Sequence, residues 1–264
     1  MESALKFHHA RALLEWQVEL GATEAIGDSP VNRFDLPESQ PRPKLKNTVN
    51  ESVVTHAAPR NAGIDAAAVA GRVAANANDL AGLRNALDGF EHCELKRGAK
   101  TTVFADGNPA ARVMVIGEAP GRDEDIAGLP FVGRAGQLLD KMFAAIGMAR
   151  DAGDAAVSVY ITNILPWRPP QNRDPLPDEI AMLLPFVKRH VELAQPELLV
   201  LMGNVSCQAL LGRKGITRLR GQWTTALNVT ALPMFHPAYL LRNSRAKREA
   251  WHDLLMLQAR LRES

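Results

Sequence analysis

Residues 113–136 read Val-Met-Val-Ile-Gly-Glu-Ala-Pro-Gly-Arg-Asp-Glu-Asp-Ile-Ala-Gly-Leu-Pro-Phe-Val-Gly-Arg-Ala-Gly. A short apolar run predicts a buried strand, an acidic turn rich in Gly and Pro follows it, and a second glycine-rich turn precedes a helical pattern. In α/β proteins ligands bind at the carboxyl ends of strands, because backbone amides and side chains converge there. We therefore expect Glu118 to lie at the rim of a binding site.

Further apolar runs follow the first, with helical patterns between them. The predicted strands are residues 113–116, 157–161, 198–202 and 230–234, and the predicted helices are residues 136–146, 177–192 and 204–211. Each strand candidate is a short apolar run bounded by turn residues, which is typical of strands buried in a parallel sheet. The alternation predicts an α/β fold, a three-layer α/β/α sandwich with a mainly parallel central sheet and an N-terminal helical extension.

Composition divides the chain into three parts. Residues 1–26 carry apolar side chains at helical spacing and predict an amphipathic helix, whereas residues 27–62 are rich in Pro and polar residues and predict a linker. Residues 63–264 form the predicted α/β domain. Its first segment, an alanine-rich stretch over residues 64–88, is predicted to be helical with Asp65 as the N-cap.

Composition also limits the compartment and the partners. The chain has 264 residues, of which 46% are hydrophobic, and only two cysteines, Cys93 and Cys207. Two cysteines are too few for a disulfide framework, and no run approaches the roughly 18 apolar residues of a membrane span, so we expect a cytoplasmic protein without membrane contact. The formal net charge of +2 is only mildly basic.

Basic residues are nevertheless concentrated in two C-terminal loops. These are Arg213, Lys214, Arg218 and Arg220 in the first loop, and Arg242, Arg245, Lys247 and Arg248 in the second. Basic residues interleaved with glycines suit a phosphate backbone, because Lys and Arg displace counterions while Gly lets main-chain amides approach. A solvated helix face is the alternative interpretation of such a cluster.

Unusual residues come at the ends of the predicted strands. They are Glu118, Asn163, Gly203 and His236. Because parallel strands end at the same sheet edge, we expect these residues to surround one pocket. Each polar one also has a structural alternative, since a glutamate can cap a helix, an asparagine can hold a turn and a histidine can be buried against a carbonyl. Together they favour a site.

Five segments, in this order, resemble the family 4 uracil-DNA glycosylases within the larger uracil-DNA glycosylase superfamily. They are residues 117–125, 128–139, 160–163, 168–173 and 236–242, and the likeness spans roughly residues 85–262. The resemblance implies a base excision repair enzyme that flips uracil out of DNA and hydrolyses its N-glycosidic bond, leaving an abasic site. Its partner is then uracil-containing DNA, and we expect a monomer.

The resemblance also implies roles for residues that bind the base. Asn163 would read the Watson–Crick edge of uracil, and Phe131 would stack on the flipped ring. His236 would donate a hydrogen bond to uracil O2 and stabilise the leaving anion. Gly117 and Ala119 would line the same pocket.

A carboxylate is expected to position or activate the attacking water and to offset positive charge on the sugar. Glu118 is the first candidate for this catalytic role. Asp125 and Glu124 are the second candidates, because the acidic turn is able to place any of the three near the sugar or the base.

The segment after His236 resembles the loop that wedges into the duplex and holds the base out. Leu240 and Leu241 would form the apolar wedge, a known device for unstacking base steps. Arg242 and Arg220 would contact phosphates, a contribution that weakens as salt rises.

One departure from the family concerns its cofactor. Family 4 members usually hold a [4Fe-4S] cluster through four cysteines, but here only Cys93 matches, while Lys96, Trp167 and Leu183 occupy the other three positions. One matching thiolate does not hold a cluster that takes four, so we predict no cofactor, no metal and no iron–sulfur cluster. Trp167 and Leu183 are expected to fill the volume with apolar packing, and Cys207 to be a buried structural thiol.

Two alternatives stay open at this point. One is a uracil-DNA binding or trapping protein of the same superfamily with little turnover. Trapping members carry a reactive histidine after the asparagine strand, whereas no histidine lies between Asn163 and His190 here. The other is an unrelated nucleotide- or phosphate-binding enzyme that uses Gly117 and Gly121. The acids in that turn would repel phosphate, and the Lys-Ser/Thr pair of a P-loop is missing.

Overall fold

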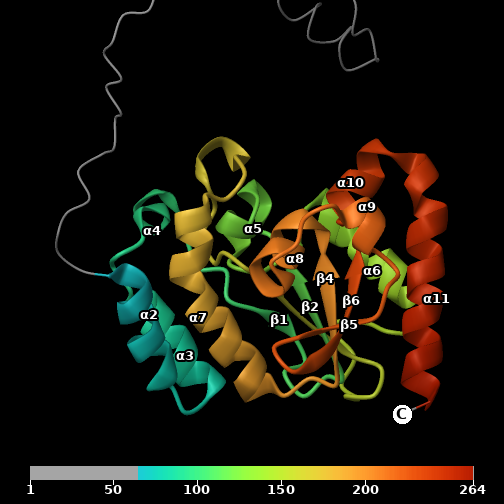
Figure 1. Cartoon of the computed structure of the whole chain (residues 1–264), viewed down its shortest axis with the longest axis horizontal. Helices are drawn as coiled ribbons and strands as arrows, with labels where there is room; N and C mark the ends of the chain where they lie inside the picture. The colour runs from blue at the N-terminus through green and yellow to red at the C-terminus, as the bar shows by residue number, and fades with distance from the viewer. Residues whose placement is uncertain (1–64, 264) are drawn as a thin grey trace, which may run out of the picture. The chain divides into compact units, whose positions relative to one another are not determined.

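The computed structural model describes residues 65–263. By its internal contacts the chain divides into two units, residues 1–58 and 59–264. The predicted amphipathic helix over residues 1–26 and the predicted linker over residues 27–62 lie outside the described residues. The α/β domain is the part shown in colour in Figure 1.

A six-stranded sheet forms the centre of the domain (Figure 1). Its strands are β1 (Asp106–Gly107), β2 (Val113–Gly117), β3 (Val159–Asn163), β4 (Leu198–Met202), β5 (Thr224–Ala226) and β6 (Val229–Met234), arranged in the order β1-β3-β2-β4-β6-β5. The four central strands are parallel, and the short edge strands β1 and β5 pair antiparallel. The predicted mainly parallel sheet is confirmed.

Helices flank this sheet on both sides, which confirms the predicted α/β class. They are α2 (Ala66–Ala75), α3 (Leu80–Asp88), α4 (Glu94–Gly98), α5 (Arg122–Ala127), α6 (Arg134–Ala144), α7 (Pro177–Ala194), α8 (Gly203–Leu211), α9 (Ile216–Leu219), α10 (Pro237–Arg242) and α11 (Lys247–Glu263), with short 3-10 turns η2 (Pro170–Asn172) and η3 (Ser244–Ala246). Figure 1 shows α2, α3 and α7 to one side of the sheet and α6, α10 and α11 to the other. Within residues 65–263, no helix has the length and apolar character needed to cross a membrane.

Strand register brings the predicted site residues to one edge. Gly117 at the end of β2 pairs with Asn163 at the end of β3, and Met202 at the end of β4 pairs with Met234 at the end of β6. All residues of β2, β3 and β4 are buried, as their apolar sequences predict. The residues that follow these strands therefore lie together at the carboxyl edge of the sheet.

Several boundaries differ from the sequence prediction, for example that of α6, which was predicted over residues 136–146. The predicted strand over residues 157–161 begins at Val159 instead, because Val157 is 42% exposed in the preceding loop, and it continues to Asn163. The predicted helix over residues 64–88 is divided into α2 and α3. Asp65 caps α2 as expected, and Asp79 caps α3 by accepting from the backbone N–H of Gly82 at 2.6 Å.

Candidate active site

A cavity of about 540 Å³ lies at the carboxyl edge of the sheet. Glu118, Asn163, Gly203 and His236, which follow or end four different strands, all line it. The pocket lining also includes four other residues predicted for the site, namely Ala119, Glu124, Phe131 and Arg242. The fold thus brings together residues that are more than 100 positions apart in sequence.

Asn163 lies on the inner wall of the pocket with an unused acceptor. Its side chain is only 5% exposed, and Oδ1 is buried without a hydrogen-bond partner. Gly117 makes this placement possible, because a Cβ at Gly117 would lie 2.3 Å from Asn163 Oδ1 and 2.6 Å from the Phe131 ring. A buried acceptor left unpaired costs about 1–3 kcal/mol, so this atom is suited to a ligand that donates to it.

Phe131 presents its ring to the pocket from an unusual backbone conformation. Its φ of 54° lies in the left-handed region, which costs a residue with a Cβ roughly 1–2 kcal/mol. The ring stacks against the imidazole of His236, with centroids 5.4 Å apart and an interplanar angle of 29°. Gly136 permits this path, because a Cβ there would lie 1.7 Å from the carbonyl oxygen of Phe131.

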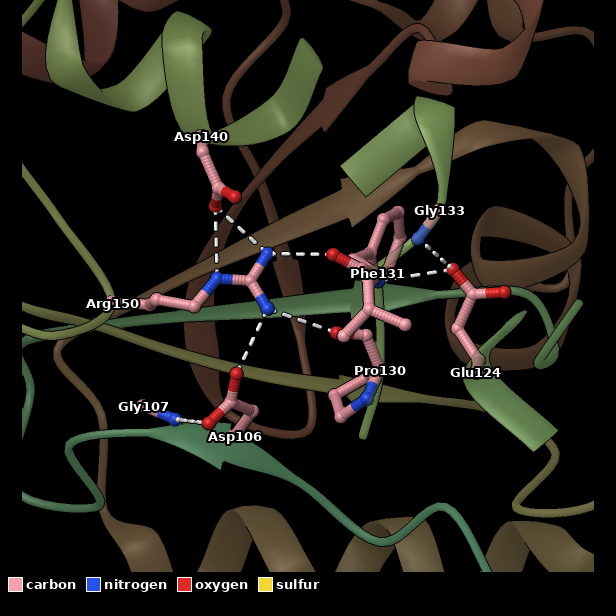
Figure 2. Close-up of polar contacts among 9 residues, drawn as sticks. Asp106, Gly107, Glu124, Pro130, Phe131, Gly133, Asp140 and Arg150 are labelled. Atoms are coloured by element: carbon pink, nitrogen blue, oxygen red, sulfur yellow. Dashed lines mark hydrogen bonds and ion pairs between the residues drawn. The ribbon is translucent and has the colours of Figure 1, made fainter. Parts of the chain in front are cut away.

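Glu124 holds the Phe131 loop from one side (Figure 2). Its Oε1 accepts from the backbone N–H of Val132 at 3.0 Å and of Gly133 at 2.8 Å, and its Oε2 accepts from the N–H of Gly121 at 3.0 Å. Both carboxylate oxygens are therefore engaged by the main chain. The role of handling water, for which Glu124 was a second candidate, does not fit this position.

Arg150 holds the same loop from the other side, and sequence reasoning missed it. Its guanidinium donates to the carbonyl oxygens of Pro130 and Phe131, each at 2.9 Å, and pairs with Asp106 and Asp140 at 2.9 and 2.8 Å (Figure 2). No spacing pattern marks a side chain that reaches backbone carbonyls 19 and 20 residues away.

His236 is held as a neutral imidazole with one free donor. Its Nδ1 accepts from the backbone N–H of Ala238 at 3.2 Å, which places the ring proton on Nε2. Burial, followed by the positive charge of Arg242, lowers the pKa of His236 from 6.5 to about 4. Gly203 allows the close approach of this side chain, since a Cβ there would lie 3.1 Å from His236 Cβ.

Glu118 is a partly buried carboxylate whose backbone is tied to the end of β3. The N–H groups of Ile164 and Leu165 donate to the carbonyls of Gly117 and Glu118 at 3.1 and 3.0 Å. Burial and the nearby negative charge of Asp174 raise the pKa of Glu118. Asp174 also lines the pocket, and its adjacency to Glu118 was not predicted, because it lies 56 positions further along the chain.

Asp125, the other second candidate for the catalytic role, lies in a structural position outside the pocket. It is 4% exposed, lies outside the pocket lining, and accepts from the backbone N–H groups of Lys100 and Thr101 at 2.8 and 3.4 Å. Asp125, which directly follows Glu124 on α5, thus holds the segment before β1 and does not face the cavity.

Of the residues predicted to contact DNA, some are exposed near the pocket and others are buried or already paired. Leu241 is 42% exposed and Arg242 is exposed at the pocket, whereas Leu240 is 1% exposed and does not fit the role of a wedge. Arg220 forms an ion pair with buried Asp253 and donates to the carbonyl of Glu249 at 2.9 Å, so the phosphate contact predicted for it does not fit its partners.

Comparisons with known proteins agree with this arrangement. Residues 104–255 match the family model of the uracil DNA glycosylase superfamily. The chain is 37% identical to the type-4 uracil-DNA glycosylase of Archaeoglobus fulgidus, over 61% of this chain and 82% of the relative. It is 38% identical to the type-4 enzyme of Thermotoga maritima, over 57% of this chain and 77% of the relative.

A more distant relative belongs to another type. The type-5 uracil-DNA glycosylase of Pyrobaculum aerophilum is 30% identical over 52% of this chain and 66% of that protein. The region that matches the superfamily model, residues 104–255, contains the pocket residues at the sheet edge, from Glu118 to His236. On its sequence match, its α/β fold and the residues gathered at its sheet edge, this chain belongs to the uracil-DNA glycosylase superfamily.

Proposed function

We propose that the domain is a uracil-DNA glycosylase, which flips uracil out of DNA and hydrolyses the bond between C1′ and N1. The buried, unpaired Oδ1 of Asn163 at the pocket wall is the observation that carries this proposal. A pocket that leaves one acceptor without a partner is matched to a ligand edge with a donor. Membership of the superfamily supports a base extruded from DNA as that ligand.

Asn163 selects uracil through paired hydrogen bonds. Its Oδ1 accepts from uracil N3–H, and its amide nitrogen donates to O4. Cytosine presents the opposite pattern at these two atoms, with an acceptor at N3 and a donor at N4. Binding cytosine would leave buried groups unpaired, a penalty of about 1–3 kcal/mol for each mismatched contact.

His236 stabilises the departing base. As the C1′–N1 bond breaks, its electron pair leaves with uracil, and negative charge develops on O2. The Nε2–H of the neutral imidazole is the free donor of this ring. It donates a hydrogen bond to O2 and so stabilises the negative charge there. One such donor in a water-excluded site contributes about 2.7–4 kcal/mol to lowering the barrier.

Glu118 serves the sugar side of the reaction. Its carboxylate offsets the positive charge that develops at C1′ and orients a water molecule toward that carbon. The water oxygen forms the new bond to C1′, and Glu118 takes the released proton. The pKa of Glu118, raised by burial and by Asp174, makes the carboxylate a better proton acceptor than an exposed glutamate.

The remaining pocket residues hold the flipped nucleotide. Phe131 stacks on the base, a contact worth about 1–3 kcal/mol, and Arg242 contacts a phosphate. Leu241, exposed on α10, occupies the gap that the base leaves in the duplex.

We propose further that the domain works without an iron–sulfur cluster. The whole chain has two cysteines, and of the positions aligned with the cluster ligands only Cys93 carries sulfur. Trp167 and Leu183 are each 1% exposed and apolar, and Lys96 bonds to the carbonyl of Asp88 and to Glu91. These side chains do not fit a group that requires four thiolates. A purified protein with no iron absorbance supports this proposal, and bound iron contradicts it.

The proposed activity is tested on an oligonucleotide with one uracil, followed by alkaline cleavage of abasic sites. The unaltered protein is compared with Asn163→Ala and His236→Ala, and His252→Ala, an exposed histidine on α11, is the matched control. We expect strand cleavage at uracil by the unaltered protein and the control, with at least a hundredfold loss for His236→Ala. Uracil-selective retention without cleavage would indicate a binding protein instead. A protein that shows neither cleavage nor retention would contradict the pocket assignment.

A further inference from the structure

The stacking platform of the pocket depends on a residue that lies outside the cavity lining. The backbone of Phe131 is left-handed, and in that geometry the carbonyls on either side of its Cα both accept hydrogen bonds. Arg150, in the loop between α6 and β3, supplies both partners. Resting on the proposed function, we propose that Arg150 is a positioning residue that presets the Phe131 ring for stacking on the extruded base.

The guanidinium is fully used in this arrangement. Nη1 donates to the carbonyl of Pro130 and to Asp106, Nη2 donates to the carbonyl of Phe131, and Nε donates to Asp140, which also forms an ion pair with Nη2. The donors of an arginine lie in one rigid plane, so they fix the spacing and direction of both carbonyls at once. A lysine ammonium at this position has the same charge but offers its donors from a single point.

Two carboxylates anchor the cation to the frame of the domain. Asp106 belongs to edge strand β1, where its Oδ1 accepts from the N–H of Gly107 at 2.9 Å, and Asp140 belongs to α6 (Figure 2). The Arg150 side chain is 15% exposed and that of Asp106 is 26% exposed, so this ion pair is largely shielded from water, whereas Asp140 is 49% exposed. The Phe131 loop is thereby held against a strand and a helix that do not depend on DNA.

Glu124 completes the clamp on the opposite side of the ring. It binds the N–H groups that directly follow Phe131, and through Gly121 it also binds the turn that carries Glu118. Carbonyls at and before Phe131 are thus held by a cation, and amides after it by an anion (Figure 2). The ring needs no rearrangement when the base enters, which lowers the ordering cost of binding.

Arg150→Lys is the variant that tests this inference. Its matched control is Arg112→Lys, because Arg112 also combines an ion pair, to Glu197 at 2.8 Å, with a bond to a carbonyl, that of Leu261 at 3.1 Å. Arg112 precedes β2 at the end of the strand opposite the pocket. Both variants retain the charge and lose the fork, but only one is connected to Phe131.

Two measurements separate positioning from general support of the fold. The first is the single-turnover rate of uracil release, taken well below the unfolding midpoint of every variant. We expect Arg150→Lys to lower it about tenfold and Arg112→Lys to leave it unchanged. In a Phe131→Ala background Arg150→Lys is expected to cause no further loss, since a residue that acts through another is non-additive with it. An equal loss in both backgrounds would overturn the inference.

The second measurement is amide hydrogen exchange of residues 131–136. Arg150→Lys is expected to speed exchange in this segment, and Arg112→Lys is not. This readout needs no turnover, so it decides the clamp even if the unaltered protein does not cleave uracil-containing DNA. Absence of cleavage would contradict the proposed function alone. Unchanged exchange in Arg150→Lys would overturn the clamp, whether or not the protein cleaves.

Discussion

Asn163 separates two hollows of very different character. The pocket on one side has a volume of about 540 Å³ and is lined by several polar groups. On the other side a residual void of about 20 Å³ is lined mostly by apolar side chains, among them Phe104, Leu183 and Phe186, together with His190. We call this second region the rear core. The same strand end therefore borders a space kept open and a space nearly filled.

Two histidines show what the difference means. Burial lowers the pKa of His190 to about 3, and His236 has a pKa of about 4, so both are neutral at pH 7. His190 stacks on Phe104 at 4.4 Å and bonds to the hydroxyl of Tyr160 at 2.9 Å, whereas His236 has an uncommitted Nε2–H at the pocket. A lowered pKa therefore does not distinguish the two histidines; the ring donor that His236 leaves free to bind a ligand does.

The largest expected effect comes from the rear core. Leu183→Ala removes a buried side chain from the closely packed rear core and leaves a cavity in its place. We expect the free energy of unfolding to fall by about 2–5 kcal/mol. Urea titration measures this loss. The rate of uracil release by the folded variant is expected to stay within a factor of two of the unaltered protein.

This first result sharpens the comparison because stability and activity are measured on one variant. A hundredfold loss of rate in folded Leu183→Ala would show that the rear core and the pocket act as one unit, contrary to the division at Asn163. A loss of stability below 1 kcal/mol would show that the rear core is not closely packed.

The next largest effect is expected at the pocket, from Gly117→Ala. A methyl group there would displace Asn163 Oδ1 or the Phe131 ring, which would lie 2.3 and 2.6 Å from it. Because a displacement of about 1 Å can cost a hundredfold in rate, we expect a loss of that size in single-turnover kinetics. Gly71→Ala on α2 is the control, since a Cβ there meets nothing within 4 Å.

If Gly117→Ala kept its full rate, the close approach of Asn163 and Phe131 would not matter for the reaction. If Gly71→Ala lost as much as Gly117→Ala, the effect would not belong to the pocket. An intermediate loss in Gly117→Ala with an altered preference for uracil would place the displacement at Asn163.

Sequence patterns were sufficient to find the four central strands and the site residues at or just past their ends. Apolar runs bounded by turns predict buried parallel strands, and such strands share one carboxyl edge, so Glu118, Asn163 and His236 could be grouped without a structure. The edge strands β1 and β5 were not predicted, because two or three residues carry no measurable period.

Side-chain direction was the part that sequence could not supply. Glu124 and Asp125 are neighbours on α5, yet one borders the pocket and the other faces the segment before β1. Successive helical residues differ by about 100° in direction, so the phase of a short helix decides their roles. Arg150 was missed for another reason, because the partners that connect it to the Phe131 loop are backbone carbonyls, which have no residue identity.

A third, smaller effect concerns pH and breaks the comparison if it is absent. The folded pKa of His190, about 3, lies below its usual 6.5, so the unfolded chain binds a proton that the folded chain does not. This contribution to stability is fully present above pH 6.5 and is lost as pH falls toward 3. Between pH 6.5 and pH 3 the free energy of unfolding falls by about 1.4 kcal/mol for each pH unit because of this group.

His190→Gln tests this linkage, because an amide can still pair with Tyr160 but does not titrate. We expect the free energy of unfolding of the variant to fall less steeply between pH 6.5 and 5 than that of the unaltered protein. The difference in slope is measured by urea titration at several pH values. Parallel slopes would contradict a neutral, buried His190.

The smallest effect separates two adjacent leucines on α10. Leu241 is 42% exposed, and its replacement by Ala is expected to change stability by less than about 0.5 kcal/mol. As the proposed wedge, it should matter only where a base stack must be opened. We therefore expect Leu241→Ala to slow uracil release from duplex DNA several-fold and to leave release from single strands unchanged.

Leu240→Ala is expected to give the opposite result. Leu240 is 1% exposed and borders a groove with Leu138 and Met142, so its loss should cost about 2–5 kcal/mol of stability without a preference between duplex and single strand. Equal slowing on both substrates by Leu241→Ala would exclude a wedge and make α10 a general binding surface. A duplex-specific effect confined to Leu241 would instead extend the division between open pocket and closed core to neighbouring residues of one helix.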